Sequence, residues 1–127
     1  MKIQGYIYKY TFPNGKVYIG QTRTTVQQRH YTHMYDARTK GRGHLVDIAL
    51  AKYGEQKPET IETIEVEESE STKLIELLNK AEQKWIQHYD SADRQKGYNV
   101  QQGGEIVTPE KMILQEKWYE IFEKEKW

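Results

Sequence analysis

The chain contains no cysteine, which excludes disulfides, thiolate metal sites and a cysteine nucleophile. It also has no apolar run approaching the ~18 residues that cross a bilayer. Its first ten residues, MKIQGYIYKY, include no apolar stretch typical of a signal peptide. The lack of cysteine is usual in a reducing compartment. The sequence therefore predicts a cytoplasmic (intracellular) protein that does not enter a membrane.

Net charge is missing as well, because 19 lysines and arginines balance 19 aspartates and glutamates. The balance hides an asymmetry. Residues 1–57 carry 10 basic and 3 acidic side chains, net +7, whereas residues 58–127 carry 9 basic and 16 acidic ones, net −7. A basic half of this kind is typical of a surface that binds a polyanion. The alternative is that the two halves attract each other within the fold.

The length of 127 residues leaves room for one domain, since a second folded unit would have almost no core of its own. The chain is 36% hydrophobic and 30% charged, with a mean hydropathy of −0.95. Its apolar residues nevertheless recur at regular spacings, which a disordered chain lacks. We therefore expect the chain to fold.

Two strands are predicted over residues 6–12 and 16–21, which are rich in aromatic and β-branched side chains. Pro13 cannot donate a ladder hydrogen bond, so a two-residue turn is disfavoured. A type I turn that begins at Pro13 and ends in a left-handed Gly15 fits every residue. That turn pairs Tyr8 with Gly20 and Tyr10 with Tyr18. One face of the hairpin then carries Tyr6, Tyr8, Tyr10, Lys16 and Tyr18, and the other carries Ile7, Val17 and Ile19.

Helical spacing of apolar residues, together with capping signals, predicts four helices. They cover residues 25–39, 44–53 and 71–90, and a last one begins at Thr108. A third strand, with an acidic exposed side, is predicted over residues 59–68. The inward stripe of the first helix is Val26, His30, His33, Met34 and Ala37, with Arg29 beside His33 at its edge. These elements predict an α+β fold.

Glu82 lies on the apolar stripe of the 71–90 helix, between Leu78 and Ile86 one turn to either side. An ionised carboxylate among apolar side chains is costly unless a cation or hydrogen bonds compensate it. A salt bridge would be the structural explanation, and a metal ion the functional one.

The hairpin carries a further pattern in YIYKYTFPNGKVYIGQT, which strongly resembles the two-part signature of the GIY-YIG nuclease family. Its first part is Tyr6-Ile7-Tyr8, with Tyr6 in place of the family glycine and Gly5 next to it, and its second part is Tyr18-Ile19-Gly20. Further along, QQRHYTH resembles the family's first helix, AEQKWI its metal-binding helix and GYNV its closing element. The resemblance covers residues 5–104.

The resemblance implies a small three-stranded antiparallel sheet flanked by helices over residues 1–104. Residues 105–127 would add an amphipathic C-terminal helix, packed on the same domain or at a dimer interface. It also implies hydrolysis of phosphodiester bonds with one divalent metal, Mg²⁺, for which Mn²⁺ can substitute. The implied site residues are Tyr8, Tyr18, Arg29, His33 and Glu82, with Glu82 as metal ligand, and Lys16, His44 and Asn99 in supporting or phosphate-binding positions.

Each residue type suits such chemistry. A carboxylate holds the metal ion, and an arginine contacts phosphate in a fork. A phenol has a pKa near ~10, so it needs a cationic setting to act as a base near neutrality, and Lys16 and Arg29 are predicted to provide it. His33 is expected to share proton transfer or to hold a phosphate.

The sequence thus predicts a DNA endonuclease of the phage, mobile-element or restriction type, with DNA as partner and a homodimer as one assembly for cutting both strands. Two alternatives stay open. One is a nucleic-acid-binding module with an inactive centre, and the other is a protein-interaction module that uses the acidic strand and the C-terminal helix.

Overall fold

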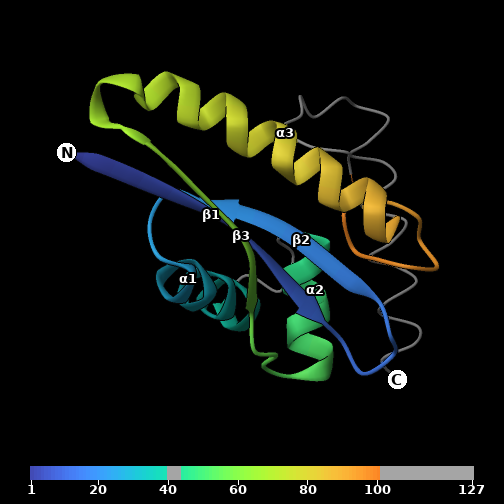
Figure 1. Cartoon of the computed structure of the whole chain (residues 1–127). Helices are drawn as coiled ribbons and strands as arrows, with labels where there is room; N and C mark the ends of the chain where they lie inside the picture. Colours follow the sequence, from blue (N-terminus) through green and yellow to red (C-terminus); the bar gives the residue numbers. More distant parts are fainter. Residues whose placement is uncertain (40–43, 101–127) are drawn as a thin grey trace, which may run out of the picture.

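A computed structural model describes residues 1–39 and 44–100, and Figure 1 shows how its elements are arranged. Three strands and three α-helices make up this part of the chain, with a short 3₁₀ turn before the last helix. The strands are β1 (Lys2–Thr11), β2 (Val17–Thr22) and β3 (Glu59–Glu67), and the helices are α1 (Val26–Thr39), α2 (Leu45–Tyr53) and α3 (Ser71–Tyr89). The predicted α+β fold is confirmed. The predicted helix from Thr108, like all of residues 105–127, lies outside the described residues.

The β1–β2 hairpin has the predicted register, with Tyr8 opposite Gly20 and Tyr10 opposite Tyr18. At its tip, the Gly15 N–H donates to the Phe12 carbonyl at 2.9 Å, and the Phe12 N–H donates to the Lys16 carbonyl at 2.9 Å. Gly15 has a φ of 85°, which a residue with a side chain rarely adopts. The turn that Pro13 requires therefore fixes which tyrosines share a face.

All three strands form one antiparallel sheet in the order β2-β1-β3. The β1–β3 register shifts between Ile7 and Tyr8, where Ile7 faces Glu62 and Tyr8 faces Thr60. The extra residue on β3 is Ile61, a bulge that explains why Ile61 and Ile64 are three residues apart rather than two. The bulge thus accounts for the interrupted alternation of apolar residues in β3.

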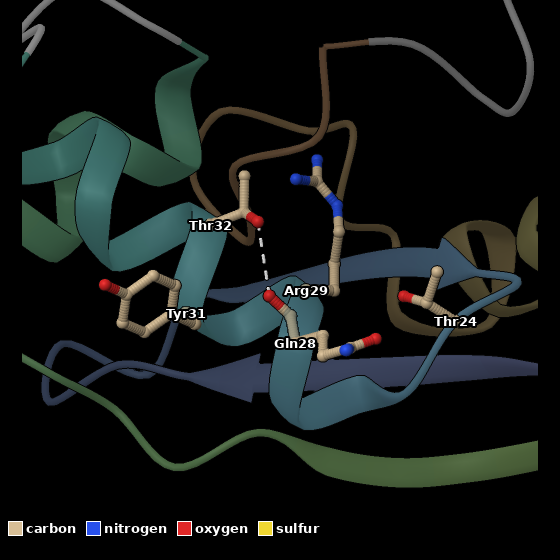
Figure 2. Close-up of a pocket in the computed structure, with 5 residues that line it drawn as sticks. All are labelled: Thr24, Gln28, Arg29, Tyr31 and Thr32. Atoms are coloured by element: carbon tan, nitrogen blue, oxygen red, sulfur yellow. Dashed lines mark hydrogen bonds between the residues drawn. The ribbon is translucent and has the colours of Figure 1, made fainter.

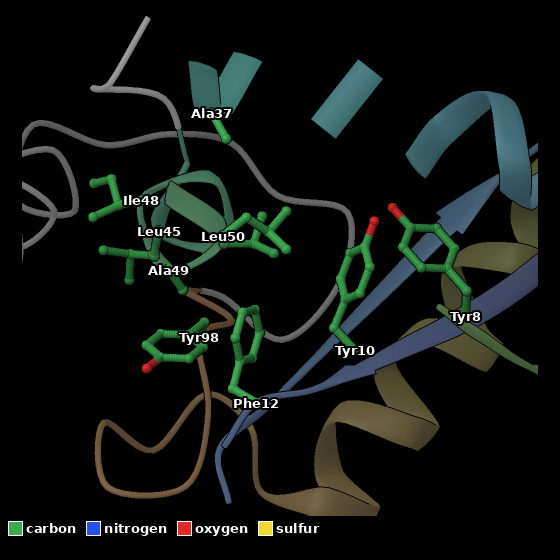
Figure 3. Close-up of a cluster of buried hydrophobic side chains, with 10 residues drawn as sticks. Tyr8, Tyr10, Phe12, Ala37, Leu45, Ile48, Ala49, Leu50 and Tyr98 are labelled. Carbon is green, nitrogen blue, oxygen red and sulfur yellow. The ribbon is translucent and has the colours of Figure 1, made fainter. Parts of the chain in front are cut away.

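Helices cover both faces of the sheet, with α3 on one side and α1 and α2 on the other (Figure 1). Under α3 the core is aliphatic: Ile7, Ile19, Leu74, Leu78, Ala81 and Ile86. The face under α1 and α2 is aromatic and includes Tyr8, Tyr10, Phe12 and Tyr98, packed against aliphatic residues of α2 (Figure 3). The alternation of β1 therefore sends its isoleucine to one core and its tyrosines to the other.

Local signals in the sequence fix the ends of two helices. The Thr25 hydroxyl accepts a hydrogen bond from the Gln28 N–H at 3.1 Å, as an N-cap does. Gly54, with a φ of 85°, follows α2 and donates its N–H to the Leu50 carbonyl. Within residues 1–39 and 44–100, no helix is long and apolar enough to span a bilayer.

Candidate active site

Tyr8 stands at the centre of the aromatic face and is only 1% exposed. Its ring fits there because Gly20 lies opposite on β2. A Cβ on Gly20 would approach the Tyr8 hydroxyl oxygen and Cζ to 2.4 Å, closer than side-chain atoms can pack. The glycine that ends YIG therefore makes room for the tyrosine of the first motif.

The Tyr8 hydroxyl lies 2.7 Å from Nε2 of His33, which projects from α1 and is fully buried. On the far side of the ring, Nδ1 of His33 lies 2.8 Å from Oδ1 of Asp47, a buried residue of α2. The second carboxylate oxygen of Asp47, Oδ2, has no hydrogen-bond partner among the described residues. Tyr8, His33 and Asp47 thus form one continuous chain of hydrogen bonds, named the inner chain below.

A second chain of the same composition runs beside it. The Tyr10 hydroxyl lies 2.6 Å from Nδ1 of His30, and Nε2 of His30 lies 2.6 Å from Oε2 of Glu55. Its acid is at the surface, because the Glu55 side chain is 66% exposed. We name Tyr10, His30 and Glu55 the outer chain. The position of His30 on the inward stripe predicted a core residue. In the structure, His30 instead links Tyr10 to the surface through its hydrogen bonds.

Tyr18, on β2, completes the aromatic group at this face. Its ring centroid lies 6.4 Å from that of Tyr8 and 5.8 Å from that of His33. The structure therefore brings together three of the predicted site residues, Tyr8, Tyr18 and His33, from two strands and one helix.

Arg29 and Glu82 approach the same group from opposite layers. Burial is the largest cause that raises the pKa of Tyr18, followed by the charge of Glu82, while Arg29 opposes it. The same two charges act on the pKa of Tyr8. Because electrostatic influence falls with distance, both groups lie near the phenols. The charges of Arg29 and Glu82 thus both act on the two predicted phenols.

Glu82 reaches this position because α3 packs across the sheet and also contacts the edge strand β2. The side-chain amide of Gln21 on β2 donates to the Asn79 side chain on α3 at 2.8 Å. Asn79 is one helical turn before Glu82, so the two share a side of α3. Glu82 is half-buried there.

Arg29 also lines a surface pocket at the N-terminal half of α1, and its guanidinium extends away from the helix (Figure 2). The other lining residues are Thr24, Gln28, Tyr31 and Thr32. Hydroxyl and amide groups beside an arginine suit a phosphate. Arg29 thus lines a surface pocket, and its charge also acts on the phenols of the site.

Burial outweighs the cationic setting that the sequence predicted for the tyrosines. Burial is the main cause that raises the pKa of Tyr8 above its ordinary value, and it raises those of Tyr10 and Tyr18 too. Arg29 lowers all three pKa values but does not reverse the shift. Lys16 shares the face as predicted, yet its ammonium lies over the Tyr98 ring, 5.5 Å from the centroid, near the hairpin tip. A phenol at this face can therefore give up its proton near neutral pH only if a neighbouring group accepts it.

His33 is such an acceptor. Burial is the largest cause that lowers the pKa of His33 below its ordinary value, and its hydrogen bond to Asp47 partly opposes the shift. His44 precedes α2 as its exposed N-cap residue and also lowers the pKa of His33, so it lies nearby. His33 is thus neutral at neutral pH.

Asn99 supports β2 from the loop after α3. Its side-chain amide donates to the Ile19 carbonyl at 2.8 Å, and its carbonyl oxygen accepts from the Ile19 N–H at 2.9 Å and from the Ser91 hydroxyl at 2.7 Å. The side chain therefore pairs with β2 as a neighbouring strand would. It fixes the segment that carries Tyr18 and Gly20.

One carboxylate fits the predicted metal. Within the described part of the chain, no three histidine, aspartate or glutamate side chains gather as ligands for one ion. Mg²⁺ keeps several waters and is bound through one or two carboxylates plus substrate phosphates, so the single carboxylate of the half-buried Glu82 suits it. A closed cage of the zinc type does not fit these residues.

Part of the charge asymmetry is used inside the fold. Lys2 and Lys9 of β1 lie 3.5 Å and 3.3 Å from Glu65 and Glu59 of β3. Attraction between the basic and acidic halves, the alternative explanation of the asymmetry, thus holds between β1 and β3.

Fold and site together define a small α+β domain whose buried phenols, histidine, arginine and glutamate converge from both sides of a three-stranded sheet. The model of the GIY-YIG catalytic domain matches residues 4–99 of the 127, which confirms the resemblance. The chain belongs to the GIY-YIG family, a nuclease superfamily. Neither the curated proteins nor the solved structures gave a match.

The sequence did not identify Asp47 or Glu55 as partners of the two histidines. A signal for Asp47 was present, because it is the single charged residue in the apolar run LVDIAL that starts α2. An acid in such a run must meet a polar partner when it is buried.

Proposed function

We propose that the chain is a divalent-metal-dependent DNA endonuclease that hydrolyses phosphodiester bonds. The observation that carries the proposal is the convergence of Tyr8, Tyr18, Arg29 and Glu82, which come from four different elements. A purely structural role would not require two phenols, a guanidinium and a carboxylate to meet at one place.

In this proposal Arg29 binds the phosphate to be cleaved. Its guanidinium is permanently charged and offers a fork of donors to phosphate oxygens. It lines the pocket of Figure 2, and its charge lowers the pKa values of Tyr8 and Tyr18, so a phosphate that it holds would lie near the phenols. Arg29 would offset the negative charge that develops in the transition state.

Glu82 would hold Mg²⁺, and Mn²⁺ is expected to substitute. When bound, the ion supplies Lewis-acid chemistry: it polarises a phosphoryl oxygen and stabilises the departing oxygen. The protein's contribution is one carboxylate, with the remaining ligands left to water and substrate.

Tyr8 is better placed than Tyr18 to activate the attacking water. Its hydroxyl already has a proton acceptor, His33 Nε2, at 2.7 Å. Tyr18 has a raised pKa and would orient the water or the phosphate with its hydroxyl in the neutral state.

DNA is the proposed partner because the nuclease family and the basic first half of the chain agree on a polyanion. One site of this kind cuts one strand at a time. A homodimer would bring a second site to the other strand.

The test is incubation of the purified protein with supercoiled plasmid in Mg²⁺, in Mn²⁺ and in EDTA. We expect nicked circles before linear product in either metal, and none in EDTA. Glu82→Gln should lose cleavage, whereas Glu76→Gln, an exposed glutamate on the same helix, should keep it.

Equal cleavage by Glu82→Gln would point to a contaminating nuclease. No cleavage by the wild type in any metal, together with salt-sensitive DNA binding, would favour the nucleic-acid-binding module. No binding at all would favour the protein-interaction module.

A further inference from the structure

Asp47 has no place in the signature that identifies the family, yet it is the buried end of the inner chain. It is 2% exposed, it lies in the buried first turn of α2, and its contact with His33 spans the α1–α2 interface. We propose that Asp47 is a positioning residue that holds His33 in the tautomer able to accept the Tyr8 proton. The inference rests on the proposed function, because it concerns the same hydrolytic step.

The tautomer follows from what each group can donate. An aspartate carboxylate only accepts hydrogen bonds, so the 2.8 Å contact requires a hydrogen on Nδ1 of His33. A neutral imidazole then has its lone pair on Nε2. The Tyr8 hydroxyl, 2.7 Å away, must therefore donate to it. With the phenol proton directed at His33, the two lone pairs of the Tyr8 oxygen are left to accept, one from the neighbouring Tyr18 hydroxyl and one from water.

The surroundings make this arrangement necessary. A buried phenolate is costly, and so is a buried imidazolium. Proton transfer from Tyr8 to His33 creates both at once, as a contact pair, and Asp47 lies on the far side to stabilise the imidazolium. The other ionisable groups facing the pair come from every layer: Tyr10 and Tyr18 from the sheet, Arg29 from α1, His44 before α2 and Glu82 from α3.

The unpartnered Oδ2 of Asp47 is a second sign of function. Leaving a buried polar atom unsatisfied costs stability, and an apolar residue at this place in α2 would avoid it. An aspartate at this position is explained if it acts on His33.

The step balances as follows. The attacking water gives a proton to the Tyr8 oxygen while the Tyr8 proton passes to Nε2 of His33. The water oxygen forms a bond to phosphorus, the bond from phosphorus to the leaving sugar oxygen breaks, and that oxygen takes a proton from solvent. His33 then returns its extra proton to solvent. The net reaction consumes one water and yields a phosphomonoester and an alcohol.

The experiment compares single-turnover plasmid cleavage by the full chain, wild type and Asp47→Asn, from pH 6 to pH 10 in Mg²⁺. An asparagine can turn its amide toward Nδ1 and so favour the wrong tautomer. We expect a loss of about 10²-fold or more at pH 7, in line with a lost general base, with DNA affinity unchanged. The gap should narrow as pH rises, because hydroxide then removes the Tyr8 proton without His33.

Glu55→Gln is the matched control, since it alters the acid of the outer chain, and it should cleave with the wild-type rate and pH profile. The double variant His33→Gln/Asp47→Asn should be no slower than His33→Gln alone, because Asp47 acts through His33. Circular dichroism of each variant checks folding. A pH-independent loss, or a double variant slower by the product of both losses, would overturn the inference.

A direct readout does not depend on cleavage. Nitrogen-15 NMR of the histidine side chains should place the His33 hydrogen on Nδ1 in the wild type and shift it toward Nε2 in Asp47→Asn. Nε2–H in the wild type would contradict the inference even if the protein cleaves DNA. The expected tautomer in a protein that fails to cleave in any metal would leave the Asp47–His33 arrangement intact but remove its proposed use.

Discussion

The inner and outer chains contain the same three kinds of group in the same order, yet they end in different places. Tyr8 and Tyr10 are two residues apart on β1, and both hydroxyls point toward α1 (Figure 3). The inner chain ends at Asp47, which is 2% exposed, and the outer chain at Glu55, whose side chain is 66% exposed. The kinds of residue in a hydrogen-bond chain therefore do not by themselves show that the chain is catalytic.

The inner and outer chains differ in burial and in the charges around them. Burial makes each charge in the inner chain dependent on its neighbours, whereas water can solvate the acid of the outer chain. Arg29 lowers the pKa values of Tyr8 and Tyr10 alike, but Glu82 is among the main charges that act on Tyr8 and not among those that act on Tyr10. The proposed metal ligand therefore acts on the inner chain. We therefore assign the chemistry to the inner chain. The role of the outer chain is to attach α1 to the segment that follows α2.

The largest expected effect separates the two tyrosines. Tyr8→Phe should slow cleavage by about 10²–10⁴-fold, the usual contribution of a general base. Tyr10→Phe, the same change two residues away, should stay within about threefold. Single-turnover rates at saturating protein measure both. Equal losses would remove the functional distinction between the chains.

A smaller effect tests the space that Tyr8 requires. Gly20→Ala places a Cβ 2.4 Å from the Tyr8 hydroxyl, and we expect a loss of about 1–3 kcal/mol in unfolding free energy, with slower cleavage. Gly15→Ala meets no atom within 4 Å but has a φ of +85°, so it should lose about 1–2 kcal/mol through strain and keep its rate. Urea unfolding and cleavage assays distinguish the two glycines.

The burial of the inner chain should also appear in the pH dependence of stability. The pKa of His33 is lowered in the folded state, so between that value and ~6.5 the unfolded chain binds more protons. Stability should therefore rise with pH through this window, with a contribution of at most about 1.4 kcal/mol per pH unit from one proton. Urea unfolding from pH 5 to pH 7 measures the slope. His33→Gln should reduce it, and an unchanged slope would contradict a buried neutral His33.

The smallest effect concerns the outer chain. Glu55→Gln removes a charge from an acid that is mostly exposed, so we expect a change of less than about 1 kcal/mol. Thermal unfolding at low and high salt checks this. A loss of several kcal/mol would mean that the outer chain is as critical to the fold as the inner one.

Much of this arrangement follows from short-range signals in the sequence. Pro13 and Gly15 determine the turn, the turn determines the register, and the register puts Tyr8 and Tyr18 on one face. Helical spacing placed His33 inward and Glu82 on the covered side of α3. These signals act over a few residues, so a single sequence is enough to read them.

The partners of the histidines could not be predicted in the same way. Asp47 meets His33, and Glu55 meets His30, only because α2 packs against α1. The raised pKa values of the phenols were missed for a related reason. Sequence spacing places Lys16 and Arg29 near the tyrosines, but only the packed structure shows that burial outweighs their charge.

The central claim is that Tyr8 and Glu82, from different layers of the fold, serve one hydrolytic centre. A double-mutant cycle on single-turnover plasmid cleavage in Mg²⁺ tests it most directly, with the wild type, Tyr8→Phe, Glu82→Gln and the double variant. Groups that act as one unit give strongly non-additive losses. We expect the double variant to be about as slow as the slower single variant. A double variant slower by the product of the two single losses would show that the two residues act independently and would contradict the claim.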